Sequence, residues 1–197
     1  MKTRVAVLGT LAEFHKEPIP YDLAALLKLV AGLQPDLLCL DLTSEQWLQQ
    51  DFSGLPPEYR EALLPLADQT DIVVVPIAGE YPPIEPARQG LAGLVIRISR
   101  RWLAFLQRTA PGPEAINQGL RHHLANLLYS LNAWLAGQQV RRAWKKHTAH
   151  LSKAVVEVTR HDPSARVLVV VNVRHCHIMR NELRNVPGIE VVKHYQL

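Results

Sequence analysis

The chain has 197 residues, of which 48% are hydrophobic and 20% charged, a balance that is typical of a globular protein and excludes a disordered one. A chain of this length can bury a sizeable core in one domain. Its formal net charge of +4 is mildly basic, and we interpret this as a solvated basic surface rather than a nucleic-acid-binding or membrane-binding one. No segment approaches the roughly 20 apolar residues that cross a bilayer, and no signal peptide is predicted.

The two cysteines are consistent with a reducing compartment. Cys39 lies in an apolar run and Cys176 in a polar cluster, and their spacing resembles neither a disulfide framework nor a structural zinc site. We therefore expect a cytoplasmic protein.

Unbroken apolar runs predict the strands. A run such as Val167 to Val171 is rich in β-branched residues without polar alternation, which is typical of a strand covered by helices on both faces. The predicted strands comprise residues 4–8, 37–42, 72–77, 166–171 and 189–193. Helices are predicted over residues 21–33, after the capping box that starts at Thr43, and over residues 58–67. This alternation indicates βαβ units in a mainly parallel sheet, and so an α/β fold.

The middle of the chain has a different pattern. From about residue 87 to residue 160 the sequence predicts helices and no strand, so we interpret this block as a helical insertion within a single α/β domain of residues 1–197. An apolar stripe of Leu124, Leu128, Leu131 and Leu135 predicts a helix face that is buried either inside the chain or in a homodimer. Arginines and lysines make the block basic, but no nucleic-acid-binding motif accompanies them.

A polar cluster follows the most clearly predicted strand. Residues 166–171 lead directly into Asn172, Arg174, His175, Cys176 and His177, and ligands of open α/β sheets bind just beyond the carboxyl ends of the strands. His175 and His177 are two residues apart, so in an extended chain their side chains point the same way. We expect a short helix only afterwards, over residues 178–185. Cys176 beside a histidine is a weaker candidate nucleophile, because no third orienting group is evident.

Other polar residues are expected to join this cluster at one edge of the sheet, if the first, second and fourth predicted strands are parallel neighbours. The candidates are Glu13, His15, Asp41 and His175, with Glu80 as an additional one from the third strand. Histidine nitrogens and carboxylate oxygens suit a divalent metal such as Zn, Mn, Co or Fe, which would lower the pKa of a bound water. Without a metal, a carboxylate–histidine pair can act as a general base. Asp41 also has a purely structural interpretation, as the cap of the following helix.

The two ends of the chain resemble the TraB/PrgY/TIKI group, within the broader set that includes the EreA-like and ChaN-like proteins. The resemblance is carried by Val7-Leu8-Gly9-Thr10 through His15, by residues 33–42, and by residues 149–192. These segments are similar to the family's Gly-Thr strand end with a nearby histidine, its strand ending in Glu-Leu, and its helix, Val-rich strand, G-x-x-H motif, short helix and final strand. The helical middle has no counterpart.

The resemblance implies an α/β fold and, as in the TIKI members, a metal-dependent peptidase activity that uses two G-x-x-H motifs. His15 would correspond to the first histidine, His175 to the second, and Asp41 to the strand-end Glu. The family's arginine on the helix before the Val-rich strand has no clear counterpart, although Lys146 or His147 falls near it.

The motif positions depart from the family pattern at three points. His15 follows Gly9 by six residues rather than three, Asn172 replaces the glycine of the second motif, and Asp41 is one methylene shorter than Glu. Two functions from different classes therefore stay open. The first is a metal-dependent, peptidase-like hydrolase of a small-molecule or peptide substrate. The second is a non-catalytic binding or interaction protein that kept the fold and lost the metal.

For the hydrolase, the residues form two overlapping sets. The predicted catalytic residues are Glu13, Asp41 and His175, and the predicted metal ligands are His15, Asp41 and His175.

Overall fold

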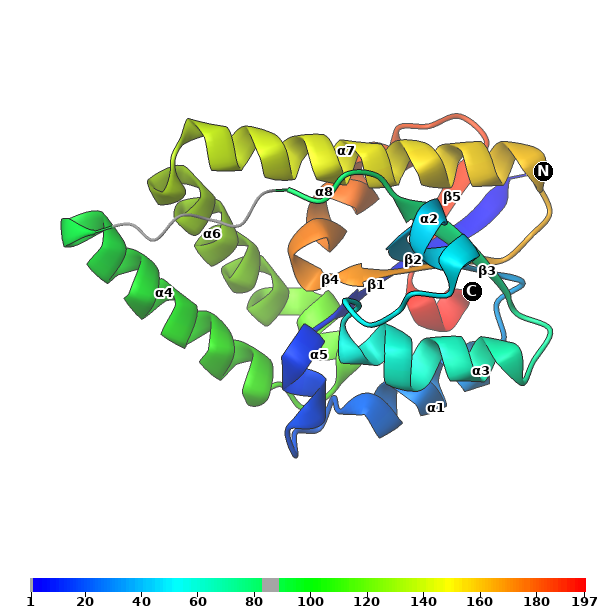
Figure 1. The fold of residues 1–197 in the computed structure, drawn as a ribbon, viewed down its shortest axis with the longest axis horizontal. Helices are drawn as coiled ribbons and strands as arrows, with labels where there is room; N and C mark the ends of the chain where they lie inside the picture. The colour runs from blue at the N-terminus through cyan, green and yellow to red at the C-terminus, as the bar shows by residue number, and fades with distance from the viewer. Residues whose placement is uncertain (1, 83–88) are drawn as a thin grey trace.

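A computed structural model of the chain describes residues 2–82 and 89–197. Within these ranges the chain forms a five-stranded sheet in which all neighbouring strands run parallel. The strands are β1 (Thr3–Thr10), β2 (Leu37–Thr43), β3 (Val73–Ala78), β4 (Val167–Asn172) and β5 (Ile189–Val192). Their order across the sheet is β3-β2-β4-β1-β5 (Figure 1). The predicted α/β class is confirmed, and β2, β4 and β1 are neighbours as expected.

Helices connect and cover these strands. The α-helices are α1 (Leu23–Leu33), α2 (Ser44–Gln49), α3 (Leu64–Asp68), α4 (Gly90–Arg108), α5 (Pro113–Asn117), α6 (Gly119–Ala136), α7 (Gln138–His161) and α8 (Val173–Arg184). Shorter elements are the 3-10 helices η1 (Ala12–Lys16) and η3 (His194–Gln196) and the π-helix η2 (Glu58–Leu63). The predicted capping box is present: the Thr43 side chain accepts from the backbone N–H of Gln46, whose own side chain accepts from the Thr43 N–H.

Successive residues of the central strands face two different cores, because strand side chains alternate between the faces of a sheet. On one face, residues such as Leu8 and Val170 pack with α1 and the π-helix η2. On the other face, Val7 and Val169 pack with α7 and α8. The three central strands are therefore buried on both sides, which is why their sequences lack polar alternation.

Residues 89–160 of the predicted insertion form helices joined by short connections and no strand; residues 87 and 88 lie outside the described residues. Its last helix, α7, returns to cover the sheet, whereas α4 and α6 pack on each other and project away from it (Figure 1). Leu124 is 39% and Leu131 37% exposed, so the predicted apolar stripe is not buried within this chain. Its burial in a homodimer stays a prediction. Within residues 2–82 and 89–197, no helix has both the length and the apolar character of a membrane span.

The junction between β4 and α8 differs from the sequence prediction. The helix begins at Val173, immediately after the strand, rather than at residue 178. The Asn172 side chain caps it by accepting a hydrogen bond from the Arg174 N–H, at 3.1 Å. The helix start also packs tightly on β1, because a Cβ placed on Gly9 would lie 2.9 Å from the Val173 Cα and 2.9 Å from the Cys176 Sγ. His175 therefore lies in the first turn of a helix, not in extended chain.

Candidate metal centre

Three side chains from three elements converge beyond the carboxyl end of the sheet. Asp41 lies near the carboxyl end of the strand β2, His147 in the middle of α7, and His175 in the first turn of α8. One candidate ligand atom from each lies within 4.8 Å of those of the other two. Both histidines are buried, and Asp41 is partly buried. We call this cluster the Asp41–His147–His175 triad.

The two nitrogens of His147 both face acceptor oxygens. Nε2 lies 3.2 Å from either carboxylate oxygen of Asp41, but only the contact with Oδ2 has hydrogen-bond geometry. Nδ1 lies 3.3 Å from the Glu80 carbonyl oxygen, to which it donates. Because a carboxylate and a carbonyl only accept, the metal-free ring satisfies both only when doubly protonated. Burial lowers the pKa of His147, but the hydrogen bond and charge of Asp41 outweigh it and raise the pKa above its usual value.

The ring of His175 is oriented by Thr148. The two side chains are hydrogen-bonded, with 2.7 Å between Thr148 Oγ1 and His175 Nδ1. The hydroxyl has one proton, and it donates that proton to the Trp144 carbonyl oxygen at 2.9 Å. It must therefore accept from an Nδ1–H, which leaves the lone pair of His175 on Nε2. Burial, the nearby His147 and the guanidinium of Arg174 lower the pKa of His175 to about 4 against the opposing charge of Asp41, so the ring is neutral at pH 7.

This arrangement fits a divalent metal. In both histidines Nδ1 is held by an oxygen from the surrounding protein, which is how metal-ligating histidines are usually fixed. The buried Asp41 Oδ1 has no hydrogen-bond partner among the described residues and is available as a ligand. A metal would replace the proton that His147 Nε2 shares with Asp41. Two histidines and a carboxylate provide three protein ligands, which is the number that catalytic zinc sites use beside an open position for water.

A cavity of about 360 Å³ opens onto the triad. Tyr81 and Trp144 form part of its wall, and the Tyr81 hydroxyl donates to the Asp41 carbonyl oxygen at 2.9 Å. The guanidinium carbon of Arg174 lies 3.5 Å from the centre of the Trp144 ring, a cation–π contact at the mouth of the site. A second cavity of about 560 Å³ shares Tyr129, Trp144, Arg174 and His175 with the first and extends between α6, α7 and α8.

Two of the predicted site residues, Asp41 and His175, are brought together. Asp41 does not cap α2, because Thr43 does. The predicted ligand His15 lies elsewhere: its Nε2 accepts from the Leu11 N–H at 2.9 Å and its Nδ1 donates to the Tyr21 carbonyl at 2.7 Å. Both nitrogens are therefore used in holding the β1–α1 loop, and the structure does not bring His15 to the triad.

The other candidates also lie apart from the triad. Glu13 is exposed on η1 and does not line either cavity. Glu80 contributes its backbone carbonyl, not its carboxylate. His177 lies two residues after His175 on a helix and so points differently, away from the triad. Burial raises the pKa of the Cys176 thiol to about 11, which argues against a nucleophile.

His147 is the site residue that the sequence pattern did not identify. It belongs to the helical block, which is separated from Asp41 by 106 positions, and nothing in the local sequence distinguishes it from other histidines. The one signal was its place on the helix before the Val-rich strand, where the resembled family has a functional arginine.

The chain was compared with models of known protein families, with curated proteins and with solved structures, and none of these matches it.

Proposed function

We propose that the protein is a metal-dependent hydrolase whose metal is held by Asp41, His147 and His175. The observation that carries this proposal is the convergence of three ligand atoms. One atom each from Asp41, His147 and His175 lies within 4.8 Å of the other two, both histidines have Nδ1 hydrogen-bonded to an oxygen of the surrounding protein, and the buried Asp41 Oδ1 has no hydrogen-bond partner among the described residues. Zn, Mn and Co are the metals that such a set of nitrogens and oxygen suits.

When bound, the metal would supply Lewis acidity and a bound water of lowered pKa. The residues of the chain have separate roles around it. Asp41 and the two histidines hold the ion, Thr148 keeps His175 in the ligating tautomer, and the Glu80 carbonyl does the same for His147. Tyr81 and Trp144 form part of the wall beside the ion.

The adjoining cavity indicates the class of substrate. Its lining combines aromatic and aliphatic side chains, such as Trp134, Tyr129 and Ile178, with the cations Arg141, Lys145 and Arg174. An apolar body with an anionic group fits such a lining, and a peptide with a free carboxylate has both features. We therefore propose a small peptide or peptide-like acid as substrate, cleaved at a bond next to the triad.

A metal titration tests the site. Wild-type protein, stripped of metal, should bind about one Zn²⁺ or Mn²⁺ per chain near pH 7.5, where the histidines can coordinate. His175→Ala should abolish this binding, whereas His161→Ala should not, because His161 is the exposed last residue of α7, where its Nδ1 lies 2.8 Å from the Glu157 carbonyl oxygen of the same helix, and it is not part of the triad. Wild-type protein that binds no divalent metal would remove the metal-dependent hydrolase.

Turnover is a separate measurement. Metal-loaded wild-type protein should cleave members of a short-peptide library, and Asp41→Asn and His147→Gln should lose that cleavage together with the metal.

A non-catalytic binding protein is the second candidate, and one observation favours it. Asp41 is the only carboxylate among the described residues that line the cavity, so an acid separate from the ligands is missing there. Stoichiometric metal binding without cleavage of any peptide or ester would support this candidate over the hydrolase.

We also propose that the chain is a divergent TraB/PrgY/TIKI-like protein that works in the cytoplasm. The position of Asp41 at the end of β2 and of His175 after β4 supports the first part. The two buried, free cysteines support the second.

A further inference from the structure

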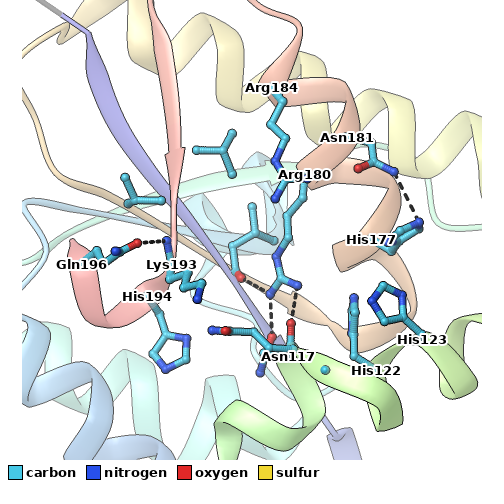
Figure 2. A pocket seen from close by; sticks show the side chains of 15 residues that line it. Asn117, His122, His123, His177, Arg180, Asn181, Arg184, Lys193, His194 and Gln196 are labelled. Carbon is cyan, nitrogen blue, oxygen red and sulfur yellow. Dashed lines mark hydrogen bonds between the residues drawn. The ribbon is translucent and has the colours of Figure 1, made fainter.

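A third cavity, separate from the triad, is lined by basic side chains. It has a volume of about 410 Å³ and lies between α8, the start of α6, and the end of the chain at β5 and η3. Figure 2 shows Arg180 and Arg184 reaching down from α8, with Lys193 and His194 on one side and His122, His123 and His177 on the other. None of the described residues that line it is acidic.

Arg180 forms the floor of this cavity and is held in place by neutral groups. Its guanidinium donates to the Asn117 carbonyl at 2.6 Å, to the Asn117 Oδ1 at 2.9 Å and to the Val7 carbonyl at 2.6 Å. Asn117 is itself buried and hydrogen-bonded to both backbone groups of Gly9. Carbonyl oxygens orient a guanidinium without cancelling its charge, and no carboxylate among the described residues pairs with Arg180.

The permanent charge comes from Arg180, Arg184 and Lys193, and the pKa values of three nearby histidines, His122, His177 and His194, are lowered from the usual value. Burial, with the charge of Arg180 and of the other histidines, lowers the pKa of His122 to about 4, and burial also lowers the pKa of His177. The exposed Glu114 lies at the edge of the cavity, with its carboxylate 3.5 Å from the His194 Nε2.

The first turn of α6 adds to the positive potential. This helix is 18 residues long, has no side-chain cap at its N-terminus and has no acidic residue in its first turn. Gln118 and Gly119, at its start, line the cavity. Unpaired backbone N–H groups and the helix dipole favour an anion at such an end.

We propose that this cavity binds a small molecule through a phosphoryl or pyrophosphoryl group. Two guanidinium groups match the geometry of phosphate oxygens, and three permanently charged side chains around one cavity favour a multiply charged anion over a single carboxylate. The volume exceeds that of one phosphoryl group and lies within the usual range of small-molecule sites. This site does not depend on the metal-dependent function proposed for the triad.

Calorimetric titration of metal-free protein with inorganic phosphate, pyrophosphate and succinate tests the proposal. Pyrophosphate should bind once per chain, more tightly than phosphate, and succinate should bind weakly. The double variant R184Q/K193Q, at two exposed positions, should weaken pyrophosphate binding about tenfold or more. The double variant K28Q/R160Q removes the same charge from exposed positions outside the cavity and should keep the wild-type affinity.

An NMR titration locates the ligand. Pyrophosphate should shift the backbone amide signals of Gly119 and Leu120, at the start of α6, and leave that of Thr148 beside the triad unchanged. Equal weakening in the two double variants, succinate binding as tight as that of pyrophosphate, shifts confined to the triad, or no saturable binding would each overturn the proposal.

Discussion

Thr148 provides the sharpest test of the metal centre, because it acts on a ligand without being one. Valine has nearly the shape of threonine, so the substitution Thr148→Val removes little more than the hydroxyl group. That hydroxyl accepts a hydrogen bond from the His175 Nδ1–H at 2.7 Å. That N–H is buried, so leaving it unpaired costs about 1–3 kcal/mol. The ring can relieve this cost by moving its proton to Nε2, which destroys the ligating lone pair.

In other metal sites, removing a hydrogen bond that holds a ligating histidine lowers metal affinity by about 10–100-fold, and we expect a decrease of this size for Thr148→Val. This corresponds to roughly 1.4–2.8 kcal/mol in binding free energy. Competitive titration of Zn²⁺ at pH 7.5 measures it, and ¹⁵N NMR of the imidazole rings reports the tautomer: Nδ1–H in wild-type protein and a mixture in Thr148→Val.

Thr159→Val is the matched control. Thr159 is also buried on α7 and also donates to a carbonyl of its own helix, that of Val156 at 2.8 Å, but it contacts no ligand. Its replacement should leave metal affinity unchanged. Equal metal affinities for Thr148→Val and Thr159→Val, or an Nε2–H tautomer in the metal-free wild-type protein, would refute the argument.

Three further outcomes are expected. First, burial lowers the pKa of His175 from 6.5 to about 4, so protonation of this group favours the unfolded chain. Between pH 7.5 and pH 5 this group should therefore lower the free energy of unfolding of the wild-type protein by roughly 2 kcal/mol. In urea unfolding, the free energy of His175→Gln should fall by about that much less over the same pH range. Second, Gly9→Ala should destabilise the fold by about 1–3 kcal/mol in urea unfolding, because its Cβ meets the start of α8, whereas Gly32→Ala, with open space around it, should be neutral or stabilising. Third, if the exposed apolar side chains of α4 and α6 are covered by a second copy of the chain, light scattering should detect a dimer that Trp102→Glu dissociates, and a monodisperse wild-type monomer would rule this out.

The sheet could be predicted from the sequence because its strands are buried on both faces. That burial leaves a continuous apolar run such as residues 167–171, and the helices between the runs impose parallel neighbours. The position of Asp41 and His175 at the same edge follows directly from this topology, since both come at or just after the ends of adjacent strands.

The rest of the site depends on contacts that local sequence does not encode. His147 reaches Asp41 only because α7 folds back over the sheet, and the sequence contains no pattern for that path. His15 is a polar residue near a strand end, but backbone groups of its own loop occupy both nitrogens. The sequence pairs His177 with His175 because no pattern in it indicates that a helix starts at Val173. The Asn172 cap that begins the helix looks in the sequence like part of the polar cluster.

Because α8 follows β4 without a loop, the number of residues after the strand determines the direction in which the His175 side chain points. Asn172 ends the strand and Val173 begins the helix, so His175 is the third residue of α8 and its imidazole takes the orientation of that helical position. An α-helix turns about 100° per residue, so one residue inserted there would swing the imidazole a quarter-turn or more away from Asp41 and would turn the buried Met179 and Leu183 of the same helix away from the sheet. The length of this junction therefore sets the direction of His175 and the packing of α8 on the sheet together, and the metal centre and this part of the core share one constraint on chain length.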